Sequence, residues 1–285
     1  MLSVPAFAED ATPSAIFEKT KSTYQSMETY KAEGNIVADV DTGGMQMKTE
    51  TSFSMLLKKP NLYLISWTQK YMPMPGMAQS GAVWSDGTQP YLYMGIMNAY
   101  SKMGSDEVAL GAATGVSGGA AFTIPSLFLS VWKGQPSPFS RLRDPKIERT
   151  EKVGEEDCYV ISGASTISKM ETFWISKSKY LIMQHSRSLE PPEGGVTMPE
   201  MTDEQIEQAI KAMGQEVTEE NKKRLRETMN RSREVLKTAK IKGSSTESYV
   251  KISSPEMGKK DFEFALPKGT VLKDSLFGGA LSGSK

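Results

Sequence analysis

The spacing of apolar residues changes several times along the chain, and its first period is helical. Thr12 and Pro13 suit the N-cap and the first position of a helix, and apolar or small residues recur every three or four positions from Ile16 to Met27. We therefore predict a helix over residues 13–27.

From residue 30 the period becomes two, as in a strand with one buried face. Met45, Met47, Phe53 and Met55 fall on one side of such a strand, and Gln, Lys, Glu and Ser occupy the positions between them. This alternation predicts a long half-buried strand.

Short turn signals separate the predicted strands. They are Asp-Thr-Gly-Gly at 41–44, Lys-Pro-Asn at 59–61 and Ser-Asp-Gly at 85–87. Consecutive strands joined by tight turns indicate an antiparallel meander.

The pattern is interrupted over residues 71–121, where we expect loops rich in Met, Gly and Ala. The stretch PSLFLSVW at 125–132 predicts a short helix that is apolar on almost every side. Such a helix must be buried or must close over an apolar surface. Strands resume over 146–163 and 170–188.

A charged helical hairpin then interrupts the sheet over residues 201–242. Thr202 with Gln205 forms a capping-box pattern, and Thr218 suits the start of a second helix. The segments SSTESYVKI and KKDFEFALPKG that follow are predicted to be the last pair of strands.

Composition narrows the function classes. Lysine plus arginine and aspartate plus glutamate both number 34, so no net field draws the chain to nucleic acid or to an anionic membrane. A single cysteine and a single histidine exclude an internal disulfide and a Cys or His metal cluster. No apolar run reaches the roughly 18 residues of a membrane-spanning helix. We predict no metal, no cofactor and no nucleic-acid partner.

The N-terminus carries an export pattern. Ala6-Phe7-Ala8 before two acidic residues has the small-x-small form of a signal-peptidase site. We expect residues 1–8 to be a signal-peptide remnant cleaved near Ala8, and residues 9–285 to form one periplasmic or secreted domain. An ordinary unstructured start is the alternative.

The order of the elements and several short motifs resemble a known superfamily. The motifs are Lys-Pro-Asn at 59–61, Ser-Asp-Gly at 85–87, Phe-Trp-Ile-Ser at 173–176 and Leu-Pro-Lys-Gly at 266–269. Together they make the chain similar to the LolA/LolB-like periplasmic lipoprotein carriers over roughly residues 12–275, apart from the helical hairpin. The nearest match is to predicted periplasmic proteins that share the domain of unknown function numbered 2092.

The resemblance implies an α+β fold that is mainly antiparallel β. It would be a strongly curved, incomplete β-barrel with an N-terminal helix, an apolar lid helix and the inserted hairpin, and family members hold acyl chains or other apolar ligands between barrel and lid. The lipoprotein carriers also use an arginine on an early strand to hold the lid closed. Here no arginine precedes Arg141, so that role has no candidate.

The Gly-rich segment GAATGVSGGAA at 111–121 does not fit a phosphate-binding loop. Gly119 is followed by Ala120 and Ala121 instead of a lysine and a hydroxyl residue, and the glycine spacing differs from that of a dinucleotide turn. We interpret the segment as a hinged, apolar flap.

Adaptable apolar side chains are the candidates for ligand contacts. Methionine, with 18 copies, suits ligands of varied shape, although core filling or, at residues 72–77, a cuprous site are alternatives. The aromatic residues line the same face or pack in an ordinary core. The predicted apolar lining consists of Met45, Met47, Phe53, Met55, Trp67, Trp84, Tyr93, Phe128, Trp132 and Trp174.

No catalytic constellation is evident, so we predict that the protein is not an enzyme. The chain lacks a G-x-S-x-G elbow, and His185 has no positioned nucleophile, so we interpret it as a partly exposed strand histidine. Cys158, in a strand-like segment, is interpreted as a buried structural thiol.

Two hypotheses for function follow. The first is an exported, non-enzymatic protein that holds a lipid, an acyl chain or another apolar ligand between the sheet and a helical lid, with a role in lipid or lipoprotein transport. The second is a periplasmic sensor or adaptor whose helical hairpin contacts a protein partner. An empty cavity favours the first. A filled interior with an exposed apolar stripe on 206–236 favours the second.

Overall fold

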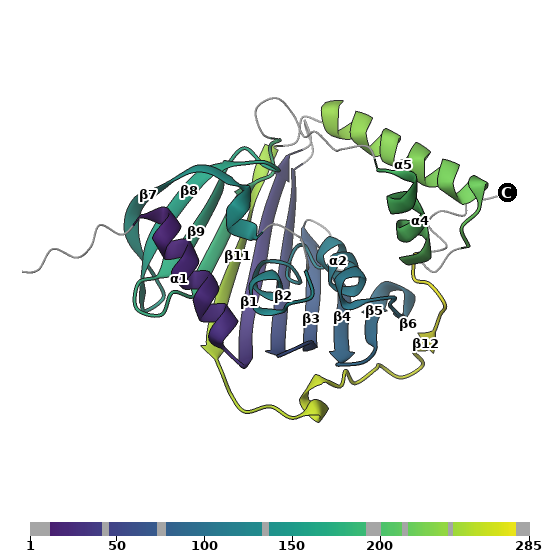
Figure 1. The fold of residues 1–285 in the computed structure, drawn as a ribbon, viewed down its shortest axis with the longest axis horizontal. Helices are drawn as coiled ribbons and strands as arrows, with labels where there is room; N and C mark the ends of the chain where they lie inside the picture. Colours follow the sequence, from purple (N-terminus) through teal and green to yellow (C-terminus); the bar gives the residue numbers. More distant parts are fainter. Residues whose placement is uncertain are drawn as a thin grey trace, which may run out of the picture.

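The fold, seen in a computed structural model, is built on one open sheet of twelve strands (Figure 1). The structure describes residues 12–41, 46–72, 78–132, 137–191, 201–212, 216–238 and 242–277. The strands are β1 (Thr29–Asp41), β2 (Gln46–Lys58), β3 (Leu62–Met72), β4 (Ala78–Asp86), β5 (Pro90–Met94), β6 (Ala99–Lys102), β7 (Leu142–Val153), β8 (Glu156–Ser165), β9 (Glu171–Ser176), β10 (Ile182–Ser188), β11 (Lys242–Ser253) and β12 (Val271–Leu272).

The sheet joins two meanders through one late strand. Its order is β12-β6-β5-β4-β3-β2-β1-β11-β10-β9-β8-β7, and only the short β12–β6 pairing is parallel. β11 therefore lies between β1 and β10, so residues from the start, middle and end of the chain meet at the centre of the sheet. The open, mainly antiparallel α+β arrangement predicted from the sequence is confirmed.

Three helices cover one face of this sheet, which we call the inner face (Figure 1). They are α1 (Pro13–Ser26), α2 (Asp106–Val116) and α3 (Thr123–Phe128). The predicted N-terminal helix is confirmed, and the Thr12 hydroxyl accepts a hydrogen bond from the Ala15 N–H at 3.2 Å, as an N-cap does.

The main hydrophobic core lies between these helices and the inner face. Ile16 and Tyr24 of α1, together with Leu110 of α2 and Phe128 of α3, pack into one cluster with strand residues such as Met55. Alternation along each strand directs every second side chain into this core. A wide apolar face and its three helices thus bury each other.

The Gly-rich segment differs from its prediction as a loop. Residues 106–116 form α2, because Ser105 caps the helix by accepting from the Val108 N–H at 3.2 Å, and Asp106 and Glu107 occupy the first turn. Ala and Leu, which favour helix, then outweigh Gly111 and Gly115. Within residues 111–121, the glycines with positive φ are Gly118, at +73°, and Gly119, at +117°, and both lie in the connection to α3.

The outer face is partly covered by the chain after β11. The segment KKDFEFALPKG, predicted to be a strand, forms the 3₁₀ helix η3 (Lys259–Phe262) and an irregular run. Phe262 packs with Leu62, and Phe264 packs with Trp84 and Tyr93. The strand prediction was wrong because alternate Phe residues here anchor a segment across the sheet instead of pairing along it.

The helical hairpin consists of α4 (Asp203–Ala212) and α5 (Glu219–Thr238), which pack on each other beside the sheet (Figure 1). The predicted caps are present: Gln205 N–H donates to the Thr202 hydroxyl at 3.3 Å, and Asn221 N–H donates to the Thr218 hydroxyl at 3.1 Å. Ile206 and Ile210 of α4 are buried. Within the described ranges, no helix has both the length and the apolar composition needed to cross a bilayer.

Candidate ligand-binding site

The inner face changes from apolar to polar between two neighbouring rows of cross-strand partners. The apolar row runs through Tyr249, Gly34, Phe53, Trp67, Gly81 and Met94. The next row, two residues along each strand, runs through Phe173, His185, Glu247, Ile36, Thr51 and Gln69. The face that α2 and α3 cover therefore has an apolar part and a charged part side by side.

We call residues 106–128, which comprise α2, α3 and their connection, the α2–α3 segment. A cavity of about 210 Å³ lies where the polar row meets this segment. Its lining combines sheet residues with the residues that join the two helices: Ile36, Thr114, Gly118, Gly119, Phe122, Thr123, Arg141, His185, Arg187, Ser245 and Glu247. Thr123, His185 and Glu247 are buried, whereas Arg141 and Arg187 are half-buried. Charged side chains therefore reach this cavity from both of its sides.

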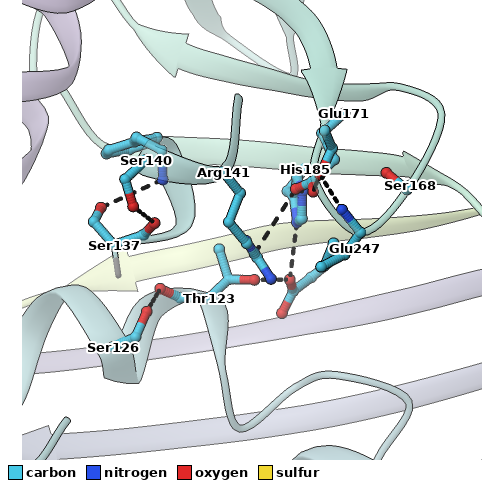
Figure 2. A network of polar contacts seen from close by, with 12 residues as sticks. Thr123, Ser126, Ser137, Ser140, Arg141, Ser168, Glu171, His185 and Glu247 are labelled. Atoms are coloured by element: carbon cyan, nitrogen blue, oxygen red, sulfur yellow. Dashed lines mark hydrogen bonds and ion pairs between the residues drawn. The ribbon is translucent and has the colours of Figure 1, made fainter. Parts of the chain in front are cut away.

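Glu171 of β9 and His185 of β10 form the buried pair at the centre of the site (Figure 2). Glu171 Oε2 lies 3.0 Å from His185 Nε2, and the Ser165 hydroxyl donates to Glu171 Oε1. The Phe173 ring stacks on the imidazole with centroids 4.3 Å apart. The pair is thus held by a hydroxyl on one side and by an aromatic ring on the other.

Both ring nitrogens of His185 face carboxylates, since Nδ1 lies 3.9 Å from Glu247 Oε2. Burial lowers the pKa of His185, but the hydrogen bonds and charges of Glu171 and Glu247 outweigh burial and raise that pKa above 6.5. Burial likewise raises the pKa of Glu171, but His185, Arg141 and Ser165 bring it below 4.5. An imidazolium held between two anions is a poor general base.

The interpretation of His185 as a partly exposed histidine was wrong, because the residue is only 6% exposed. Strand alternation places it on the inner face beside Phe173, under the helices. Strand alternation could have revealed this burial from the sequence. Glu171, His185 and Glu247 fall on the same face of their strands as the buried apolar residues.

Glu247 connects the sheet to α3. Thr123 Oγ1, at the start of α3, donates to Glu247 Oε2 at 2.8 Å (Figure 2). The other carboxylate oxygen, Oε1, is buried without a hydrogen-bond partner in the described part of the chain, and so is the Tyr249 hydroxyl. Burial, followed by the Glu247 charge, raises the pKa of Tyr249. Buried acceptors without partners are uncommon in folded proteins.

Arg141 ends the 3₁₀ helix η2 (Pro138–Arg141) and points into the same cluster (Figure 2). Its guanidinium lies 4.8 Å from the Phe122 ring centroid and 3.8 Å from Glu171 Oε2. Nε is buried and unpartnered among the described residues. Burial lowers the pKa of Arg141, Glu171 raises it, and Arg187 lowers it further, with a net decrease. No early-strand arginine exists, yet this later one lies against the α2–α3 segment.

The residues of the predicted apolar lining lie on both faces of the sheet. Phe53, Met55, Trp67 and Phe128 belong to the inner core. Trp84 and Tyr93 pack on the outer face with Phe264, and Trp174 packs on the outer face with Cys158 and Val160. Of these, Phe53 and Trp67 are in the apolar row next to the cavity.

The other predicted lining residues are only partly buried or lie outside the described residues. Trp132, just after α3, is half-buried against Phe122, with the ring centroids 5.6 Å apart. Met47 is 37% exposed at the start of β2. Met45 and the predicted signal remnant 1–8 lie outside the described residues. Whether any of the ten contacts a ligand stays a prediction.

Cys158 is buried, as predicted. Burial raises its pKa to about 11, so it is a thiol at neutral pH and a weak nucleophile. Among the described residues, no group of His, Cys, Asp and Glu side chains has an arrangement that could hold a metal ion.

The pair at the centre of the site makes a testable pH prediction. Because the folded-state pKa of His185 is raised, its stabilising contribution is complete below about pH 6.5 and is lost as pH rises through the raised value. We expect the free energy of unfolding of the wild type, minus that of His185→Gln, to fall as the pH rises above 6.5 in urea titrations. A flat difference over this range would contradict the assignment.

Comparison with known proteins adds similarities of fold. No family model matches the chain, and no curated protein matches its sequence. An uncharacterized conserved protein from Thermus thermophilus has 8% identity and a TM-score of 0.41, over 91% of this chain and 98% of that one. A LolA superfamily protein from Nitrosomonas europaea has 10% identity and a TM-score of 0.29, over 89% and 98% of the two chains.

A third similar structure is the Mycobacterium tuberculosis lipoprotein LppX, with 10% identity and a TM-score of 0.40 over 85% of this chain and 96% of that one. Domain family 2092 is not among these similarities. The resemblance to the LolA/LolB-like superfamily predicted from the sequence is found again among the solved structures.

Proposed function

We propose that this protein is an exported, periplasmic, non-enzymatic binding protein that holds an acyl-bearing ligand between the inner face and the α2–α3 segment. The observation that carries the proposal is the division of the inner face into an apolar row and an adjoining charged cavity, both under the same helices. An amphiphile has the same two parts. Lipid or lipoprotein transport is the role we propose for such binding.

The apolar row offers the binding energy. Phe53 and Trp67 are 4% and 5% exposed, and the α2–α3 segment contributes small residues such as Ala113 and Ala120. Each methylene moved from water into such surroundings contributes about 0.8 kcal/mol, so one long chain supplies useful affinity without a catalytic group. Phe53, Met55, Trp67 and Phe128 are the lining residues that we retain for this contact.

Entry of a chain requires the α2–α3 segment to act as a lid, because side chains fill the inner core. The two glycines with positive φ, Gly118 and Gly119, lie in the connection between the helices. A Cβ at Gly119 would meet no atom within 4 Å, so the connection is not tightly packed at that position. This connection is the proposed hinge.

The filled core is the one observation that favours the second hypothesis, an adaptor that acts through the helical hairpin. The adaptor hypothesis also predicts an exposed apolar stripe on the hairpin. In α4 this stripe is not exposed, since Ile206 and Ile210 are 2% and 0% exposed. We therefore rank ligand binding first.

Quenching of tryptophan fluorescence by dibromostearate tests the proposed function and its location. We expect the quencher to act mainly on Trp67, so that Trp67→Phe removes most of the quenching. Trp84→Phe and Trp174→Phe are matched controls, because both side chains pack on the outer face. These two variants should be quenched as strongly as the wild type. Native mass spectrometry of protein purified without detergent would identify any lipid that copurifies.

Two results would contradict the proposal. Quenching that survives in Trp67→Phe and is lost in Trp84→Phe would place the ligand on the outer face. The absence of both quenching and copurified lipid would favour the adaptor, and the helical hairpin would then be used to search for a protein partner.

A further inference from the structure

Among the described residues, positive and negative charges around the cavity do not balance. Arg141, Arg187 and His185, once its imidazole is protonated, carry three positive charges, against the two carboxylates of Glu171 and Glu247. A surplus of one positive charge is costly in a partly buried site unless an anion neutralises it.

The hydrogen-bonding capacity of Arg141 is also unused. A guanidinium has five N–H donors, yet the side chain of Arg141 makes no hydrogen bond to the described residues, and its nearest carboxylate oxygen is 3.8 Å away. Its Nε is fully buried. Arginine commonly binds a carboxylate or a phosphate in a bidentate way, so Arg141 offers donors that an anionic group of a ligand could accept from.

Arg187 adds a second cation to the same cavity. It lies on β10 two residues after His185, lines the cavity, and forms no ion pair with the described residues. Its charge contributes to the lowered pKa of Arg141, which means that the two guanidiniums repel each other across the site. An anion between them would be attracted by both guanidiniums, and these two attractions would offset the repulsion.

From these observations we infer that Arg141 and Arg187 bind the anionic oxygens, carboxylate or phosphate, of the ligand's headgroup in the cavity under Gly118–Thr123. The inference rests on the proposed function, because the apolar row with Phe53 and Trp67 adjoins the cavity and would receive the attached chain. It specifies the ligand class: an acyl chain that ends in an anion.

Calorimetric titration with four probes tests the inference. Dodecanoate carries both parts, dodecanol carries the chain alone, and acetate and inorganic phosphate are anions without a chain. We expect wild type to bind dodecanoate more tightly than dodecanol, and Arg141→Gln or Arg187→Gln to weaken dodecanoate about 10-fold to 100-fold. Dodecanol affinity should change by less than about twofold, since the chain contacts other residues.

Arg143→Gln is the matched control, because Arg143 lies two residues further on, is exposed, and does not line the cavity. It should bind dodecanoate like the wild type. Arg141→Lys keeps the charge without the planar fork, and an intermediate affinity is expected. It also serves as the second variant if Arg141→Gln does not fold.

Stability provides a readout that separates ligand binding from a structural role. Because Arg141 makes no hydrogen bond to the described residues, and burial and the Arg187 charge outweigh its ion pair with Glu171, Arg141→Gln should unfold at the same urea concentration as the wild type or at a higher one. A large loss of stability together with an unchanged preference for dodecanoate over dodecanol would overturn the inference.

The remaining outcomes separate the inference from the proposed function. Equal binding of dodecanol and dodecanoate, insensitive to either arginine, overturns the anion site and leaves the proposed function standing. Arginine-dependent binding of phosphate or acetate without binding of dodecanoate or dodecanol supports the anion site, assigns it to a free anion and rejects the proposed function. No binding of any probe overturns both.

Discussion

Glu171→Gln is expected to lower the free energy of unfolding by about 3–5 kcal/mol, because it breaks a buried ion pair by removing one partner. Glu171 is 0% exposed and accepts from Ser165 and His185, with Arg141 nearby. The amide cannot neutralise these cations, so His185 and Arg141 would stay buried with Glu247 as the one remaining carboxylate of the cluster. Urea unfolding near neutral pH measures the loss.

The control for this prediction is a carboxylate in an exposed pair. Glu151 and Arg149 are 42% and 56% exposed, and such pairs contribute about 0–1 kcal/mol, so Glu151→Gln should have a small effect. Adding His185→Gln to Glu171→Gln should recover part of the loss, because the unpaired cation is then removed. The prediction fails if Glu171→Gln costs no more than Glu151→Gln.

Phe173→Ala is the second large effect, with an expected loss of about 3–5 kcal/mol from the cavity that it creates. Phe173 is fully buried, stacks on His185, and meets Phe139 and Phe17 edge-on at centroid distances of 5.1 Å and 6.3 Å. One side chain thus joins α1, η2 and the polar cluster. The urea midpoint should fall sharply.

Met170→Ala is the comparison, since Met170 is close in sequence but 46% exposed, and surface changes usually stay within about 0.5 kcal/mol. Phe173→Leu should cost less than Phe173→Ala because it leaves a smaller cavity. A loss for Phe173→Ala as small as that for Met170→Ala would show that the aromatic cluster does not stabilise the fold.

The local elements of this protein could be predicted from the sequence because their signals are local. Thr12 caps α1, Thr202 and Thr218 cap α4 and α5, and the alternation around Phe53 gives β2. Each signal spans a few residues and follows from helix capping or strand alternation. The same reasoning was wrong for residues 106–116, where the glycines suggested a loop although the segment begins with a good N-cap. It was also wrong for KKDFEF, where the alternating Phe residues pack on the outer face and do not form a strand.

The candidate site could not be predicted in this way, because its residues meet only through the order of the strands. His185, Glu247 and Ile36 become neighbours once β11 inserts between β10 and β1, although they are far apart in the chain. Arg141 reaches this row from outside the sheet.

What the sequence determined by itself was the class of fold, the helices and strands with local signals, and the absence of a cysteine or histidine metal cluster. Only the tertiary structure decided which polar residues are buried together. Burial and unpaired hydrogen-bond donors are properties of a side chain's three-dimensional surroundings, and so the unpartnered Nε of Arg141 can be recognised only when the strands are in place.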